Sequence, residues 1–189
     1  VDDGSTDGTY EKANQFIVDN NQGDKVILIR NDVKMGRVGS MYRAVDSCLD
    51  KEIIIPLDAK DWLSSPIVLN RFNAAYQNPD VFVAFGQMID YPTYEFKEFA
   101  QSSFYSALFK QIKLQDLFKN GSFANHCSAY MEPVIRLSGG RVRKMQEPIA
   151  FSNTSCPVEP TAAPLDIAEY EPLQAFPETR AKMAADILI

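Results

Sequence analysis

The stretch IIIPLDAKDWL, residues 53–63, decides the fold of this chain. Its β-branched beginning predicts a buried strand, and the carboxylates of Asp58 and Asp61 follow at the point where that strand ends. In an open α/β sheet, ligands bind at the carboxyl ends of the strands. Carboxylates at such a place can hold a hard divalent cation that also contacts a phosphate. The alternative is that both carboxylates only make turn and cap hydrogen bonds.

Strands and helices alternate on either side of this stretch. Helices are predicted at residues 10–20, 41–49 and 66–76, and apolar strands at residues 25–30, 52–57 and 81–85. Short connections and apolar strands predict a doubly wound α/β domain, with a mostly parallel sheet flanked by helices. Val1 reads as the last residue of an earlier strand. We therefore expect a fragment whose first strand is missing, or a sheet that a second chain completes.

The alternation ends after residue 86. A helix is predicted at residues 98–113, where Phe and Tyr recur at helical spacing, and a second at residues 126–137. The aromatic side chains of the first helix are predicted to be core residues rather than cofactor contacts. Residues 141–145 are predicted to form one more strand.

The chain changes character near its end. Five of the eleven prolines follow Cys156, and no glycine does. This composition predicts an extended or poorly ordered tail at residues 154–189, with a short closing helix at about residues 178–188. We therefore expect one globular domain at residues 1–153, followed by the tail.

The composition narrows the classes of function. The net charge of −6 argues against a nucleic-acid partner, which would need a basic surface. An acidic protein that binds an anionic ligand needs local compensation, from a metal ion or from a few Lys and Arg side chains. The three cysteines are widely spaced and form neither a disulfide framework nor a zinc pattern, which favours a reducing cytoplasm. No apolar run approaches the length of a membrane-spanning helix, so the expected location is the cytoplasm, free or peripheral to the inner membrane.

Two further segments carry side chains suited to a ligand. Residues 1–9, VDDGSTDGT, place two carboxylates directly after an apolar residue and before a predicted helix. Residues 31–39 form a loop with two glycines and the basic residues Lys34 and Arg37. A glycine-containing loop ahead of a helix can cradle a phosphate, and the alternative is an ordinary surface connection.

These segments, taken in order, resemble the family 2 glycosyltransferases, which have the GT-A fold. The resemblance rests on VDDGSTDGT, on Asn31 with Gly36, and on LDAKDWL at residues 57–63. It continues through YQNPDVFVAFGQMIDYP and FYSALFKQIKLQDLFKNGSF, which resemble one bacterial branch that builds surface polysaccharide. It covers residues 1 to about 153.

The resemblance implies an inverting transfer of sugar from a UDP-type nucleotide-sugar donor to a hydroxyl of a glycan or lipid-linked acceptor. Asp3, with Asp2 beside it, is expected to face the uracil. Asp58 and Asp61 are expected to reach the ribose, the diphosphate and its Mg²⁺ or Mn²⁺, which neutralises the leaving group. The expected nucleotide-sugar-binding residues are Asp2, Asp3, Gly36, Arg37, Asp58 and Lys60, and the expected metal ligands are Asp58 and Asp61.

Two departures from the family pattern bear on activity. Lys60 stands where the family's D-x-D-D motif has a carboxylate. Either the site has lost its metal and most of its catalysis, which we favour, or the Lys60 ammonium stands in for the metal. Cys127 stands where the catalytic general base is expected, and His126, the only histidine, is next to it. His126 is therefore the candidate base, and the alternative is that it only packs or faces solvent. Together these departures leave open a catalytically inactive relative that binds a nucleotide-sugar or a partner protein.

Overall fold

The computed structural model describes residues 1–119, 121–124 and 126–155. The helices are α1 (Thr9–Asp19), α2 (Gly36–Asp46), α3 (Val68–Tyr76), α4 (Ser106–Lys110), the 3-10 helix η1 (Leu114–Leu117) and α5 (Ser128–Leu137). The strands are β1 (Ile53–Ile54), β2 (Trp62–Leu63), β3 (Val83–Tyr91), β4 (Phe96–Tyr105), β5 (Phe118–Lys119), β6 (Ser122–Phe123) and β7 (Val142–Asn153). The predicted closing helix and nearly all of the predicted tail lie outside the described residues.

Five strands form one sheet in the order β1-β4-β3-β7-β2, and β5 pairs with β6. The fold is α/β, as predicted, but the prediction of a mostly parallel sheet is wrong. Only β3 and β7 run parallel, whereas the pairings of β1 with β4, β4 with β3 and β7 with β2 are antiparallel. The physical reason is the connection between β3 and β4: a hairpin joins them, and strands joined by a hairpin must be antiparallel.

The prediction of a helix at residues 98–113 is wrong in its first half, which forms β4. Phe104 lies opposite Val83, and Ser103 lies opposite Ala84. Aromatic residues favour strands as much as helices when a neighbouring strand is available, so the pairing with β3 overrides the helical spacing. The helix begins only at Ser106. The prediction that these aromatic residues are core is confirmed where their side chains are described, since Phe104, Tyr105 and Phe109 are buried.

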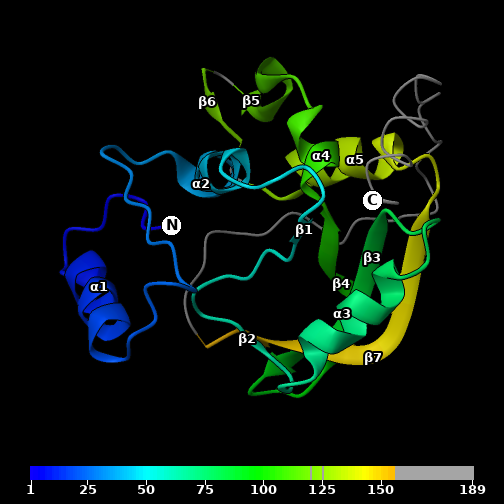
Figure 1. Ribbon diagram of the computed structural model, residues 1–189, viewed down its shortest axis with the longest axis horizontal. Helices are drawn as coiled ribbons and strands as arrows, with labels where there is room; N and C mark the ends of the chain where they lie inside the picture. Colours follow the sequence, from blue (N-terminus) through cyan, green and yellow to red (C-terminus); the bar gives the residue numbers. More distant parts are fainter. Residues whose placement is uncertain (120, 125, 156–189) are drawn as a thin grey trace.

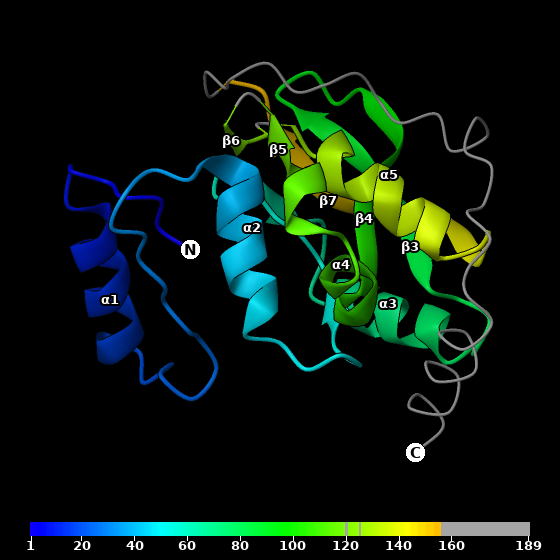
Figure 2. The same ribbon diagram turned by 90° about the horizontal axis from the view of Figure 1, so that it is seen from above.

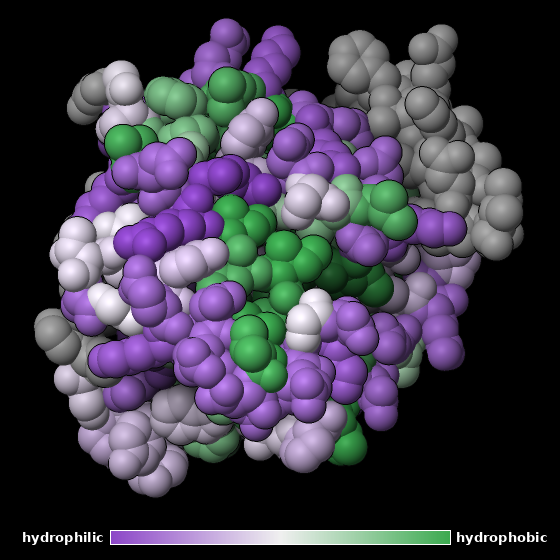
Figure 3. All heavy atoms as spheres, turned by 60° about the vertical axis from the view of Figure 1, so that its left-hand side comes forward, coloured by the Kyte–Doolittle hydropathy of each residue, from purple (hydrophilic) through white to green (hydrophobic). Residues whose placement is uncertain are grey.

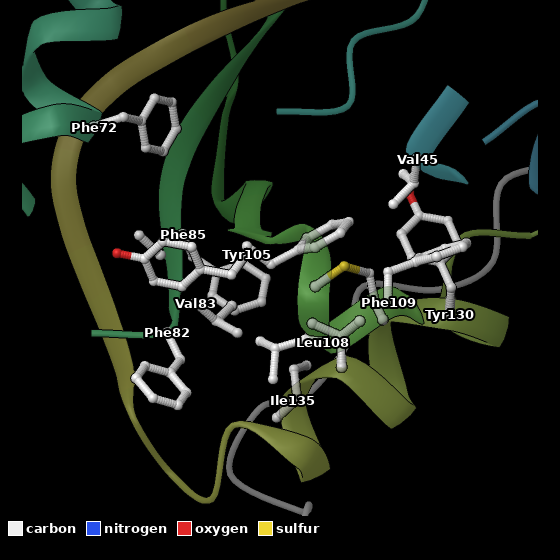
Figure 4. Packing of buried hydrophobic residues seen from close by; sticks show 14 of the residues in the cluster. Val45, Phe72, Phe82, Val83, Phe85, Tyr105, Leu108, Phe109, Tyr130 and Ile135 are labelled. Atoms are coloured by element: carbon white, nitrogen blue, oxygen red, sulfur yellow. The ribbon is translucent and has the colours of Figure 1, made fainter. Parts of the chain in front are cut away.

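Helices cover both faces of the sheet (Figure 1). Successive residues of β4 point to opposite faces. Tyr105 contacts Tyr76 of α3 with 5.0 Å between ring centroids, whereas Phe104 contacts Tyr130 of α5 at 6.1 Å. Figure 4 shows the resulting core, with Phe72 of α3 on one side of β3 and the side chains of α4 and α5 on the other. This packing places the first turn of α5 against the rest of the domain.

The prediction of a buried strand at residues 25–30 is also wrong. Within the described part of the chain, the only bridge to this segment joins Arg30 to Asp2, in the parallel sense. The Asp2 N–H donates to the Ile29 carbonyl at 2.8 Å, and the Asn31 N–H donates to the Asp2 carbonyl at 2.9 Å. Ile27 is 79% exposed. An apolar run becomes a buried strand only when neighbours pair with it and cover it, and here one residue pairs with it.

The predicted first helix is confirmed as α1, but it buries none of its residues. Phe16 on this helix is 65% exposed. Figures 1 and 2 agree that α1 lies apart from the sheet, on the far side of α2. On the side of the molecule that carries α1, apolar side chains gather in a patch surrounded by hydrophilic ones (Figure 3).

Candidate functional site

The carboxylate of Asp3 is held by the loop that leads into α2. Its Oδ1 accepts hydrogen bonds from Asn31 Nδ2 at 2.7 Å and from the Met35 N–H at 2.8 Å, and its Oδ2 accepts one from the Gly36 N–H at 2.8 Å. The first N–H groups of a helix have no partner within the helix, and its positive end favours an anion. Asp3 therefore fixes residues 1–9 against the start of α2.

These hydrogen bonds also set the charge of Asp3. Burial acts to raise the pKa of this carboxyl, but the hydrogen bonds from Met35, Asn31 and Gly36 outweigh it, and the pKa lies below its ordinary value. A carboxylate offers about four acceptor positions. Asn31, Met35 and Gly36 donate to three of them, and a hydrogen bond from the Ser40 side chain lowers the pKa further.

The glycine at residue 36 is required by the shape of this loop. Gly36 has φ +74°, which lies in the left-handed region that other residues rarely adopt. That conformation turns the chain so that its N–H meets Asp3 while the helix continues into Arg37. In the loop predicted as a phosphate cradle, the N–H groups of Met35 and Gly36 are directed at the Asp3 carboxylate, so the cradle stays a prediction.

A polar network supports Asp3 from behind. Asn31 is buried, and its Nδ2 also donates to Ser40 Oγ at 3.1 Å. Its Oδ1 accepts a hydrogen bond from Arg43 Nη1 at 2.9 Å. The carboxylate of the neighbouring Asp2 faces another way, since it accepts the Ser5 N–H at 3.2 Å and lies 3.8 Å from Arg30 Nε. The two adjacent carboxylates therefore have separate surroundings.

Arg37 joins α2 to the stretch that follows β1. Its Nη2 lies 3.0 Å from Asp58 Oδ1, and both side chains are about one-third exposed. The structure therefore brings four of the predicted site residues into one connected group: Asp3, Gly36, Arg37 and Asp58. The same ion pair gives Asp58 a side-chain contact outside its own turn. The sequence pattern did not predict this pairing, because nothing in the spacing of residues 37 and 58 indicates that they meet.

The first turn of α5 lies within electrostatic reach of the Arg37–Asp58 pair. Tyr130 is fully buried, and burial raises the pKa of its hydroxyl far above the ordinary value. The charges of Cys127 and Asp58 raise this pKa further, whereas the Arg37 guanidinium lowers it. Tyr130 was not among the predicted site residues.

Lys60 and Asp61 contact the end of β7 rather than α2. Asp61 Oδ1 accepts a hydrogen bond from the Asn153 N–H at 3.0 Å, and Lys60 Nζ donates to the Asn153 carbonyl at 3.3 Å. Lys60 Nζ also lies 3.9 Å from Asp61 Oδ1. The Asp61 N–H donates to the Asp58 carbonyl at 2.9 Å, which closes a turn over residues 58–61. The turn is therefore closed by the backbone, and the carboxylates of Asp58 and Asp61 contact Arg37 and Asn153 outside it.

The predicted bases lie directly before α5. His126 Nδ1 is 2.5 Å from Ser128 Oγ, so a neighbouring hydroxyl orients the imidazole ring. The Cys127 side chain is half-buried and packs against the core.

The side chains as placed do not fit a preformed divalent-metal site. In the described part of the chain, no three His, Cys, Asp or Glu side chains come together in a way that could hold a metal ion. Of the two predicted ligands, Asp58 is paired with Arg37, and Asp61 lies beside Lys60. Mg²⁺ and Mn²⁺ favour several oxygen ligands around one ion. Two carboxylates that each already contact a cation do not supply them.

Comparison with known proteins identifies the family. The model of glycosyl transferase family 2 matches residues 1–136, so the chain belongs to this family. Members transfer sugars from nucleotide-sugar donors to acceptors and typically use a divalent metal. The α/β fold is consistent with the GT-A fold expected from the sequence. A search of curated proteins found no match. In the residues that the structure describes, none of the helices combines the length and the apolar character needed to cross a membrane.

Proposed function

We propose that this chain binds a UDP-type nucleotide-sugar at the group formed by Asp3, Gly36, Arg37 and Asp58, and transfers the sugar to an acceptor hydroxyl with inversion. The observation that carries the proposal is the Arg37–Asp58 pair, because it joins the two ligand-binding segments predicted from the sequence. The acceptor is a glycan or a lipid-linked sugar, and no nucleic acid is involved. Assembly of a bacterial surface polysaccharide is the process that the sequence resemblance favours.

Within this site, the base and the diphosphate would contact different residues. We assign the Asp3 carboxylate to accept the imide N–H of uracil in place of one of its present donors, with Asp2 stabilising the adjoining backbone. The guanidinium of Arg37 can donate two parallel hydrogen bonds to a diphosphate. Lys60 lies two residues from Asp58 and supplies a second positive charge at the turn. These two cations supply the local compensation that an acidic protein needs in order to bind an anion.

The predicted Mg²⁺ or Mn²⁺ stays a prediction, and we route no step through it. As placed, Arg37 and Lys60 occupy the surroundings of the carboxylates that would hold the ion. We propose that these cations neutralise the leaving diphosphate. His126, oriented by Ser128, is the group we assign as general base for the acceptor hydroxyl, with Cys127 at the position where the family places a carboxylate.

Turnover tests the proposal most simply. Release of UDP from UDP-glucose, UDP-galactose and UDP-N-acetylglucosamine should be measured with a coupled assay, in EDTA and in Mn²⁺. We expect release from at least one donor, and a loss of at least tenfold in Arg37→Gln. Lys34→Gln removes a charge from the same loop at an exposed residue and should leave the rate unchanged. Equal rates in both variants would contradict the role of Arg37.

The second candidate is a nucleotide-sugar-binding relative without catalysis. It is favoured by the engagement of both predicted metal ligands and by Cys127 at the position of the expected base. In this case UDP would bind, but no donor would be turned over in either condition. The binding and turnover measurements together therefore separate the two candidates.

The prediction that a further strand or a second chain completes the sheet also remains a prediction. β1 stands at the end of the strand order and pairs only with β4 within the described residues. An unpaired edge offers backbone N–H and C=O groups to an added strand.

A cytoplasmic location, or one at the surface of the inner membrane, likewise stays an expectation from composition.

A further inference from the structure

Four aromatic side chains meet next to the proposed donor site, and we call them the aromatic platform: Trp62, Tyr91, Tyr94 and Phe151. The Trp62 ring stacks on Phe151, with 5.4 Å between centroids and 16° between planes. Tyr91 contacts the edge of Trp62 at 5.6 Å, and Tyr94 contacts the edge of Tyr91 at 5.9 Å. The rings therefore form one connected group rather than four separate side chains.

The platform is open to solvent. Trp62, Tyr91 and Tyr94 are 40%, 38% and 61% exposed. Large aromatic side chains contribute most when buried, and a contiguous exposed group of them marks a binding surface. Packing within the domain does not account for this arrangement, because the rings contact one another while remaining exposed.

The backbone holds three of the four rings in fixed positions. Trp62 lies opposite Phe151 in the pairing of β2 with β7. Phe151 is paired with Ile89 of β3, two residues before Tyr91, so Tyr91 and Phe151 point to the same face of the sheet. Rings on paired strands are preorganised, and a preorganised surface loses little conformational freedom on binding.

The platform begins where the proposed donor site ends. Trp62 directly follows Asp61, whose Oδ1 accepts the Asn153 N–H at 3.0 Å. Asn153 is in turn paired with Tyr91. Lys60 Nζ, which donates to the Asn153 carbonyl, lies at the same border. A ligand on the platform would therefore lie beside the turn at residues 58–61.

A sugar ring is the ligand that this surface fits. A pyranose presents C–H groups on its flat face and hydroxyls around its rim. Flat rings fit the C–H face, and the phenol hydroxyls and the indole N–H can hydrogen-bond with the hydroxyls of the rim. The net charge of −6 disfavours an anionic lipid surface as the occupant. We propose that the aromatic platform binds a pyranose ring of the acceptor glycan. This inference rests on the proposed function only in naming that glycan as the acceptor.

The test uses a property of the chain, because Trp62 is its only tryptophan. Indole emission therefore reports on the platform alone. Cellohexaose, maltohexaose and chitohexaose are titrated to about 10 mM into the full chain without nucleotide. We expect a saturable change in emission with at least one of them. Tyr94→Ala keeps Trp62 and should weaken that binding at least fivefold, whereas Phe16→Ala, which removes an exposed ring on α1, should leave it unchanged.

Three results would overturn the inference. They are no change in emission with any of the three hexasaccharides, equal affinity in Tyr94→Ala, and a change that follows phosphatidylglycerol vesicles or protein concentration instead of saccharide. The vesicle and concentration results would assign the platform to a lipid surface or to a second copy of the chain. Titration of UDP into Tyr94→Ala separates this inference from the proposed function. If Tyr94→Ala loses saccharide binding but binds UDP as the wild type does, the result supports the aromatic platform. If the variant loses only UDP binding, the result contradicts the separation of the platform from the donor site.

Discussion

At the scale of single residues, Asp3 accounts for the connection between the start of the chain and α2. Its two oxygens accept three hydrogen bonds, two of them from N–H groups at the start of the helix. Hydrogen bonds to a charged group each contribute about 1.5–3 kcal/mol. Asp3→Asn keeps one oxygen but replaces the other with a donor that faces an N–H group. We expect this change to lower the free energy of unfolding at pH 7 by about 2 kcal/mol.

The effect of Asp3 should depend on pH. Its pKa is lowered in the folded state, below the ordinary value of 3.8. The charged carboxylate therefore stabilises the fold above that value, and its contribution is lost as the pH falls through the folded pKa. Urea unfolding of wild type and Asp3→Asn should differ at pH 7 and converge as the pH falls below 3.8. The exposed Asp32→Asn in the following loop serves as the control. A difference that is constant with pH would contradict the assignment.

Arg37 should matter little for stability. Both members of the Arg37–Asp58 pair are about one-third exposed, and exposed ion pairs contribute at most about 1 kcal/mol. We expect Arg37→Gln to change the free energy of unfolding by less than that in urea denaturation. A loss above about 2 kcal/mol would show that the pair holds the fold together, and effects of this variant on binding could then not be assigned to a ligand contact.

At the scale of elements, the turn at residues 58–61 decides whether a metal can bind. Lys60→Asp would place a third carboxylate beside Asp58 and Asp61 and would remove the ammonium that lies 3.9 Å from Asp61. We expect this variant to bind Mn²⁺ at least tenfold more tightly than the wild type in calorimetric titration. Lys60→Gln removes the same charge without adding a ligand, so it should gain less. No gain in Lys60→Asp would mean that the turn cannot gather its carboxylates around one ion.

The pairing of β3 with β7 depends on a close approach at Gly86. A Cβ there would lie 2.1 Å from Ile149 Cγ1 and 2.9 Å from its Cβ. Gly86→Ala should therefore lower the free energy of unfolding by about 1–3 kcal/mol. Combined with Ile149→Ala, the loss should be smaller than the sum of the two single losses, because the clash is shared. Gly23→Ala, which meets nothing within 4 Å, is the control. Additive losses would contradict the clash.

The spacing of apolar residues within each segment predicted most helices and strands, but not which strands pair with one another. The helices α1, α3 and α5 follow from spacing within the segment itself, whereas α2 begins at Gly36, inside the loop predicted at residues 31–39. The strand β4 does not, because its conformation depends on β3, which supplies hydrogen bonds from across a hairpin. Residues 25–30 fail for the opposite reason: their apolar pattern requires covering neighbours, and the described chain supplies one bridge. In α3, Phe72 and Tyr76 are buried, whereas Leu69 is exposed.

At the scale of the whole molecule, the candidate site draws on segments that are distant in sequence. The motifs predicted which segments contribute, and Asp3 and Gly36 do meet. The Arg37–Asp58 contact and the placement of Asn153 beside Asp61 depend on how the layers pack. Such contacts are set by tertiary structure, so spacing along the chain carries no signal for them. The same holds for the aromatic platform, whose members come from three strands and a hairpin turn.

A calorimetric titration of UDP into the wild type, Arg37→Gln and Lys34→Gln, each in EDTA and in Mn²⁺, tests most directly whether Asp3, Gly36, Arg37 and Asp58 form a nucleotide site. We expect saturable binding by the wild type in both conditions. We expect binding at least tenfold weaker in Arg37→Gln, a loss of about 1.4 kcal/mol or more, and unchanged binding in Lys34→Gln. Binding seen only with Mn²⁺ would show that Asp58 and Asp61 gather a metal, contrary to the neutralising role given to Arg37 and Lys60. No binding in either condition would contradict the claim that this group of residues is a nucleotide site.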